Sequence, residues 1–143
     1  MVRVHLAPPN FINMNKERLT SLAERLLEIP NAISEKQGMV LDYNEQIQEI
    51  SNEISQIESV IKTEINSQVD DNGKKVYTNA ESREAAFIEV SRTNTELMDK
   101  RKSLSSVQGY LSIERIKIEA LGSEQRNIRS ILYFFGGSES ETV

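Results

Sequence analysis

One stretch of the sequence places apolar side chains at alternating spacings of three and four residues without a break. Glu, Gln, Asn and Ser fill nearly every other position of this stretch. A repeat that averages 3.5 residues puts one narrow apolar stripe on a helix, and such a helix supercoils against partner helices. The stripe, here called the heptad seam, consists of Val40, Tyr43, Ile47, Ile50, Ile54, Ile57 and Ile61.

The heptad seam predicts a long helix over about residues 33–68. A helix of that length cannot bury its stripe against itself, so it needs partner helices. Ile at both core positions favours more than two helices in model coiled coils. The pattern therefore predicts a multi-helix assembly.

Residues that break helices divide the rest of the chain. Pro8 and Pro9 exclude helix near the start, so residues 1–12 are expected to be extended. A short helix over residues 15–28 should end before Pro30. The Asn72-Gly73 turn breaks the chain between residues 69 and 79, and a capping box over residues 78–81 then opens a second long helix.

These boundaries predict an all-α chain: a long helical hairpin, or coiled-coil-like bundle, with a short N-terminal helix. We expect an N-terminal arm with its helix over residues 1–30 and the hairpin, which carries oligomerisation and binding, over residues 31–135. The polar, acidic residues 136–143 should form a disordered tail.

The C-terminal helix carries more apolar surface than one hairpin can cover. A second apolar set, including Tyr110, Ile113 and Ile116, lies off its main stripe, and a helix that is apolar on two faces is normally buried between neighbours. We therefore expect a homo-oligomer, assembled through Leu111, Ile118, Leu121, Ile128 and Leu132.

The composition leaves little for catalysis. The chain has no Cys and one His, His5, so disulfides, thiolate metal sites and His-based catalysis lack their residues. No Gly-rich phosphate loop is present, and Glu residues at i, i+4 spacing are typical of a solvated helix face. We expect a protein that is not an enzyme and has no metal or cofactor.

No run of 18 apolar residues and no signal peptide occur in the 143 residues. The sequence therefore predicts a cytoplasmic protein without a membrane partner. If a phage encodes it, the location is the host cytoplasm.

The two long helices differ in charge. Residues 33–71 hold nine acidic residues against two lysines, whereas residues 100–134 hold seven basic residues against three glutamates. This asymmetry has two interpretations: the segments pair with each other, or the basic segment faces a polyanion.

The basic segment supplies the candidate binding residues, Arg115, Lys117, Arg126 and Arg129. Arg126 and Arg129 lie three apart on one helix face, and the aromatic residues 133–135 follow. Basic groups beside aromatic rings suit single-stranded nucleic acid, because bases stack while phosphates are neutralised. In the alternative interpretation the aromatic rings belong to an oligomer core and the arginines pair with the acidic helix.

The layout resembles the phage recombination mediators of the UvsY type. The resemblance is carried by VDDNGKKVYTNAESREAA over residues 69–86, by IERIKIEALGSEQRNIRSILYF over residues 113–134, and by the Ile-rich first helix. It implies a small helical oligomer that binds single-stranded DNA and helps a RecA-like recombinase to displace a single-strand binding protein. Lys117, Arg126 and Arg129 fall where that family places basic, DNA-facing residues. The acidic balance, the N-terminal arm and the acidic tail depart from the family's pattern.

Two functional hypotheses follow. In the first, the chain is a non-enzymatic recombination mediator that oligomerises on single-stranded DNA, with a recombinase and a single-strand binding protein as partners. In the second, it is a coiled-coil structural or interaction protein, such as an adaptor, a virion component or an inhibitor, without nucleic-acid binding.

Overall fold

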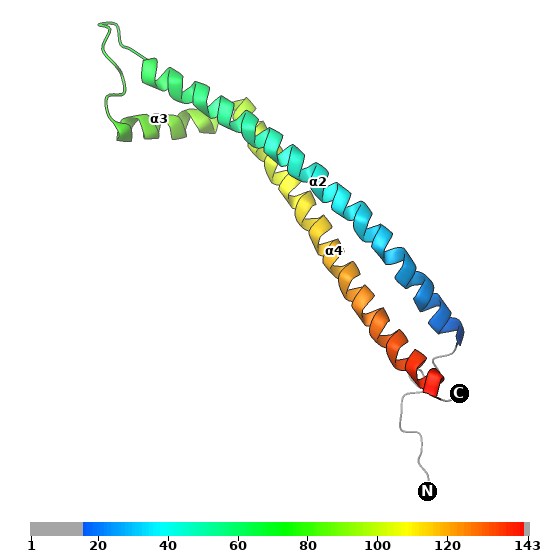
Figure 1. Cartoon of the computed structure of the whole chain (residues 1–143). Helices are drawn as coiled ribbons and strands as arrows, with labels where there is room; N and C mark the ends of the chain where they lie inside the picture. Colours follow the sequence, from blue (N-terminus) through cyan, green and yellow to red (C-terminus); the bar gives the residue numbers. More distant parts are fainter. Residues whose placement is uncertain (1–15, 142–143) are drawn as a thin grey trace. The chain divides into compact units, whose positions relative to one another are not determined.

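Three α-helices make up almost all of the part of the chain that is described (Figure 1). The structure, a computed structural model, describes residues 16–141, and of residues 137–141 only the backbone. The helices are α2 (Lys16–Ser67), α3 (Ala80–Thr93) and α4 (Thr95–Glu141). Residues 16–141 contain no strand beyond one isolated antiparallel bridge between Val69 and Lys75. The all-α prediction is confirmed. The expected extended arm over residues 1–12 and His5 lie outside the described residues.

The chain forms two compact units. We call residues 39–113 the loop unit, because it holds the connection between α2 and α3. Residues 1–38 and 114–143, so far as they are described, are the terminal unit. Within each unit, a part of α2 packs against a part of α4.

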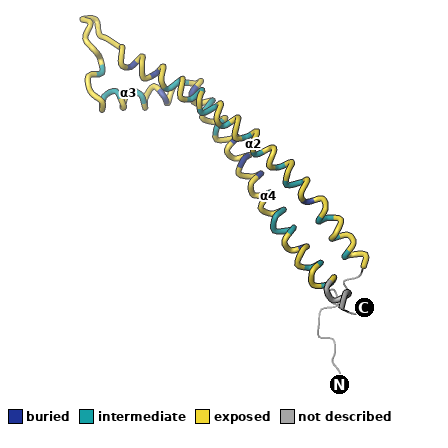
Figure 2. The backbone as a smooth tube through the Cα atoms, viewed as in Figure 1, coloured by how far each residue is buried: buried dark blue, intermediate teal, exposed yellow. Residues whose placement is uncertain are grey.

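In the loop unit the heptad seam faces the rest of the chain. All seven seam residues are half-buried or buried, whereas the positions between them are mostly exposed (Figure 2). Ile61 and Ile65 form a buried cluster with Leu97 of α4, and Ile54, Ile57, Tyr77 and Phe87 pack against it. The 3.5-residue repeat therefore identified the buried face of this helix.

The break between α2 and α3 occurs where it was predicted. Asp70 accepts the backbone N–H groups of Asn72 and Lys74 through one carboxylate oxygen, at 2.9 Å each. Gly73 has a φ of 76°, a conformation that side chains with a Cβ rarely adopt. The capping box lies one residue later than expected: Asn79, not Thr78, is the N-cap, and it exchanges hydrogen bonds with Ser82.

Two predicted boundaries differ from the structure at the ends of the chain. Pro30 lies inside α2, so the expected short helix and the long helix are one helix. Pro30 removes one backbone hydrogen bond. The helix continues through that position because contacts on both sides hold it. Arg25 and Lys36 form ion pairs with α4, and Ile29 is completely buried. At the other end, α4 continues to Glu141 although a disordered tail was expected from residue 136, because extending an existing helix adds one hydrogen bond per residue.

The predicted second long helix is interrupted at Asn94, where α3 ends and α4 begins. Asn94 ends α3 through its backbone N–H, which donates to the carbonyl oxygen of Val90 at 3.0 Å. Its side-chain oxygen accepts the backbone N–H of Leu97 at 2.9 Å and so caps the start of α4. One asparagine thus serves two helix ends.

Candidate nucleic-acid interface

Three of the four predicted DNA-binding residues share one exposed face of α4. Successive residues of an α-helix are about 100° apart around its axis, so Arg115, Arg126 and Arg129 lie within about 60° of one another. All three belong to the terminal unit, and all three are exposed. The helix therefore presents three guanidinium groups to solvent in one direction.

The Arg126 side chain lies back along the helix toward its N-terminal end. Its Nη2 atom donates a hydrogen bond to the Ser123 hydroxyl at 3.0 Å. Its Nη1 atom lies 3.5 Å from the place that a Cβ would occupy at Gly122. The guanidinium thus lies against the helix surface, and most of its donors stay available to another group.

Tyr133 extends this face, although the predicted site did not include it. It follows Arg129 by four residues and Arg126 by seven, so it lies on the same side of the helix. Its exposed fraction, 86%, is the largest among the exposed large apolar and aromatic residues of the described chain. The i, i+3, i+7 spacing of Arg126, Arg129 and Tyr133 was the sequence signal for this addition. These three residues and Arg115 are called the arginine face below.

Lys117, the fourth predicted residue, lies elsewhere. It is about 200° around the helix from Arg115. Its ammonium group lies 3.4 Å from an oxygen of Glu114, while Lys36 of α2 lies 3.5 Å from the other oxygen. Glu114 is only 6% exposed, so these two lysines compensate the charge of a buried carboxylate on α4. The structure thus places the Lys117 ammonium beside the buried Glu114 carboxylate and not with the three arginines.

The acidic helix pairs with a different set of basic residues. In the loop unit, Lys100 pairs with Glu53, and Arg101 donates to Glu58 at 3.1 Å. The hydrogen bond and the charge of Glu53 raise the pKa of Lys100 above its ordinary value. Part of the charge asymmetry is therefore explained by pairing between α2 and α4.

The arginine face takes no part in that pairing. Within the described residues, Arg115, Arg126 and Arg129 form no ion pair with an acidic side chain. The basic segment thus contains residues that pair with acidic residues of α2 and residues that face the solvent.

The residues predicted for oligomerisation are partly covered within one chain. Leu111 and Ile128 are buried, and Ile118, Leu121 and Leu132 are half-buried. The side chains off that stripe are the exposed ones, as at Tyr110, Ile113 and Ile116. The main stripe therefore serves first as the intramolecular contact of α4.

Two other kinds of feature, a metal site and a membrane-spanning helix, are absent from the described part of the chain. Across residues 16–136, no three His, Asp or Glu side chains are grouped closely enough to hold a metal ion. No described helix combines the length and apolar character needed to cross a bilayer.

Comparisons of the chain with protein-family models, with curated proteins and with solved structures find no match. The resemblance to the UvsY-type mediators therefore stays a prediction.

Proposed function

We propose that this chain is a non-enzymatic protein that binds single-stranded DNA through the arginine face. The observation that carries the proposal is the exposed group of Arg126, Arg129 and Tyr133 on one side of α4. Guanidinium groups bind phosphate oxygens through paired hydrogen bonds. An exposed aromatic ring offers a stacking surface to an unpaired base.

The single strand fits this face better than a duplex does. Stacking on Tyr133 requires a base whose ring face is accessible, and a duplex hides those faces inside the helix. A surface with three arginines neutralises few phosphates, so one copy should bind weakly, with a Kd of about 10⁻⁴ to 10⁻⁶ M at physiological salt. Useful affinity then requires several copies on one strand, because linked sites gain about 10²- to 10⁴-fold in avidity.

The proposal includes a homo-oligomer. Of the seven residues of the heptad seam, only Ile61 is buried within the chain, and the other six are half-buried. A further helix from a second copy would complete their burial, and each fully buried Ile or Leu side chain contributes roughly 1.5–3 kcal/mol. Sedimentation of the wild-type chain at micromolar concentration tests this. A particle heavier than the 16.3 kDa chain is expected, and a monomer would contradict the oligomer.

The biological role that we propose follows from the resemblance. An oligomer that holds single-stranded DNA could present the strand to a RecA-like recombinase while a single-strand binding protein is displaced, in the host cytoplasm if a phage encodes the chain. This role needs no catalytic group of its own. It also needs no metal or other cofactor.

The experiment that tests DNA binding measures fluorescence anisotropy of labelled single-stranded oligonucleotides of increasing length. Affinity should rise with length until one strand spans several copies, and a duplex of equal length should bind more weakly. Absence of binding to a long single strand at low salt would contradict the proposal. Equal affinity for single strand and duplex would contradict the role of Tyr133.

A structural or interaction protein is the alternative, and one observation favours it. The loop unit keeps several large apolar side chains well exposed, including Val60, Met98 and Tyr110. Exposed apolar groups of this kind occur at protein-binding surfaces. Failure of the DNA experiment, together with a stable oligomer, would favour this alternative.

A further inference from the structure

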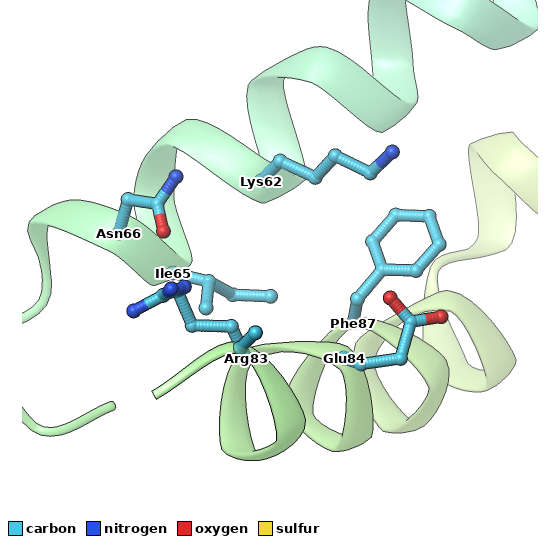
Figure 3. A pocket seen from close by; sticks show the side chains of 7 residues that line it. Lys62, Ile65, Asn66, Arg83, Glu84 and Phe87 are labelled. Carbon is cyan, nitrogen blue, oxygen red and sulfur yellow. The ribbon is translucent and has the colours of Figure 1, made fainter. Parts of the chain in front are cut away.

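A pocket in the loop unit lies between the last turns of α2 and the first turns of α3 (Figure 3). Its volume is about 190 Å³. From α2 it is lined by Lys62, Ile65 and Asn66, and from α3 by Arg83, Glu84 and Phe87. These residues meet because the turn after residue 67 brings α3 back against α2. The pocket thus combines cationic and apolar side chains from two helices.

Arg83 is half-buried in this pocket without a partner for its charge. Its side chain forms no hydrogen bond or ion pair with another described residue. In Figure 3 its guanidinium lies on the side of Asn66, whereas the Glu84 carboxylate lies on the side of Phe87. The nearest acid in the sequence is therefore turned away from the guanidinium. A half-buried cation in this state gains free energy when an anion binds beside it.

Two further donors face the same space. The Lys62 ammonium lies 4.9 Å from the centre of the Phe87 ring, which holds it over the pocket wall. Asn66 lines the Arg83 side and has an amide that can donate hydrogen bonds. An anion in the pocket would therefore meet Arg83 and Asn66 first, and the positive potential of Lys62 from the side of Phe87.

The floor of the pocket is apolar. Ile65 is 5% exposed and belongs to the buried cluster, and Phe87 packs against that cluster. Small-molecule sites usually measure about 300–1,000 Å³, so a pocket of this size suits one or two side chains rather than a nucleotide. The occupant should thus bring a small apolar group together with its negative charge.

The charge of the lining selects between a carboxylate and a phosphate. Arg83 and Lys62 supply two positive charges, and Glu84 supplies one negative charge that would repel a dianion. The planar guanidinium fork can bind a carboxylate or a phosphate through two parallel hydrogen bonds, so the negative charge of Glu84 is what favours the singly charged carboxylate. We propose that this pocket docks a protein partner that inserts an aliphatic side chain and the carboxylate of a neighbouring Glu or Asp. This docking is independent of the arginine face on α4.

The probe that tests the proposal is the dipeptide acetyl-Leu-Glu-amide, titrated into the full ¹⁵N-labelled chain. Its matched control is acetyl-Leu-Gln-amide, which has the same shape without the charge. The amide signals of Asn66, Ala80 and Arg83 should shift with a Kd of about 1 mM. The uncharged dipeptide and inorganic phosphate should both shift them much less.

Variants then test which positive charge of the pocket binds the carboxylate of the dipeptide. Arg83→Gln should lower the affinity for the dipeptide at least about tenfold, because it removes charge-assisted hydrogen bonds. Lys62→Gln should weaken it less, since Lys62 does not lie beside Arg83. Arg92→Gln is the matched control on the same helix, because Arg92 is exposed and pairs, among the described residues, with Glu89 of its own helix. It should leave the affinity unchanged.

Three results would overturn the proposal. They are the absence of shifts at the pocket up to about 10 mM dipeptide, equal affinity of Arg83→Gln and wild type, and binding of phosphate as tight as that of the dipeptide. The last would identify a general anion site instead. Circular dichroism of both pocket variants checks that their helices are intact.

Discussion

Arg25 of α2 and Glu124 of α4 form a two-point ion pair across the terminal unit. Nε of Arg25 lies 2.6 Å from Oε1 of Glu124, and Nη2 lies 2.9 Å from Oε2. The two residues are 99 positions apart in the sequence. Two parallel hydrogen bonds fix the angle between the groups as well as their distance. The pair therefore sets the register of the antiparallel helices in this unit.

This pair should make the terminal unit sensitive to acid. The hydrogen bonds and charge of Arg25 hold the pKa of Glu124 below its ordinary value of 4.5. The pair therefore stabilises the fold above that value, and its contribution is lost as the pH falls through the lower pKa of the folded state. The melting temperature of Glu124→Gln should lie below that of wild type at about pH 7, and the difference should shrink in acid as the pH falls through the lowered pKa of Glu124.

Glu119→Gln is the control for this effect. Glu119 is exposed on the same helix and forms no ion pair with a described residue. Its replacement should leave the melting temperature within error of wild type both at neutral pH and in acid. A gap between wild type and Glu124→Gln that is as large in acid as at neutral pH would contradict the assignment to Glu124.

Pro30 should lower the free energy of unfolding, because it lies inside a helix. It is exposed within α2, and its ring removes one backbone hydrogen bond. Pro30→Ala should therefore raise the free energy of unfolding by about 1–3 kcal/mol, measured by urea denaturation. Gly38→Ala calibrates the measurement: a Cβ at Gly38 meets nothing within 4 Å, so a gain of about 1 kcal/mol is expected. Loss of stability in Pro30→Ala would show that the proline ends a helix.

The predictions for the fold succeeded where local pattern and tertiary contact agree. The heptad seam identified the buried face of α2, and Asn72-Gly73 identified the turn. Pro30 misled the boundary prediction because the contacts that hold the helix around it, at Arg25 and Lys36, come from residues about 80–100 positions away. Sequence-local rules contain no information about such partners.

The grouping of the candidate site residues could be predicted only in part, for a similar reason. Helical spacing alone groups Arg115, Arg126 and Arg129. It does not show that Lys117 compensates Glu114, because half of that arrangement comes from Lys36 on another helix. The double capping role of Asn94 could not be predicted either, because it depends on a break in the helix that the apolar pattern does not mark.

Asn94 should contribute more to the stability of the fold than its small side chain implies. Asn94→Ala removes the cap at the start of α4 and should lower the free energy of unfolding by about 0.5–2 kcal/mol. Asn94→Asp keeps the acceptor and should retain most of the stability. Asn127→Ala, at an exposed position inside α4, should cost almost nothing. Equal stability of Asn94→Ala and Asn127→Ala in urea denaturation would rule out the capping role.

Tyr133 should contribute to DNA affinity without contributing to its salt dependence. Stacking of one base on an aromatic ring is worth about 1–3 kcal/mol, so Tyr133→Ala should weaken the binding of single-stranded DNA by about 5- to 150-fold. Tyr133→Phe keeps the ring and should bind like wild type. Anisotropy titrations at several salt concentrations should give parallel lines for all three proteins. Unchanged affinity in Tyr133→Ala would exclude stacking at this residue.

The central claim is that Arg126 and Arg129 neutralise phosphates of single-stranded DNA, and the salt dependence of binding tests it most directly. Each phosphate contact to a single strand adds about 0.7 to the slope of log affinity against log salt. The double variant Arg126→Ala, Arg129→Ala should therefore reduce the slope by about 1.4. The control with Lys74→Ala and Lys75→Ala, which removes the same charge from exposed positions in the loop unit, should keep the wild-type slope. Equal slopes for wild type and the arginine variant, with intact helices by circular dichroism, would contradict the account.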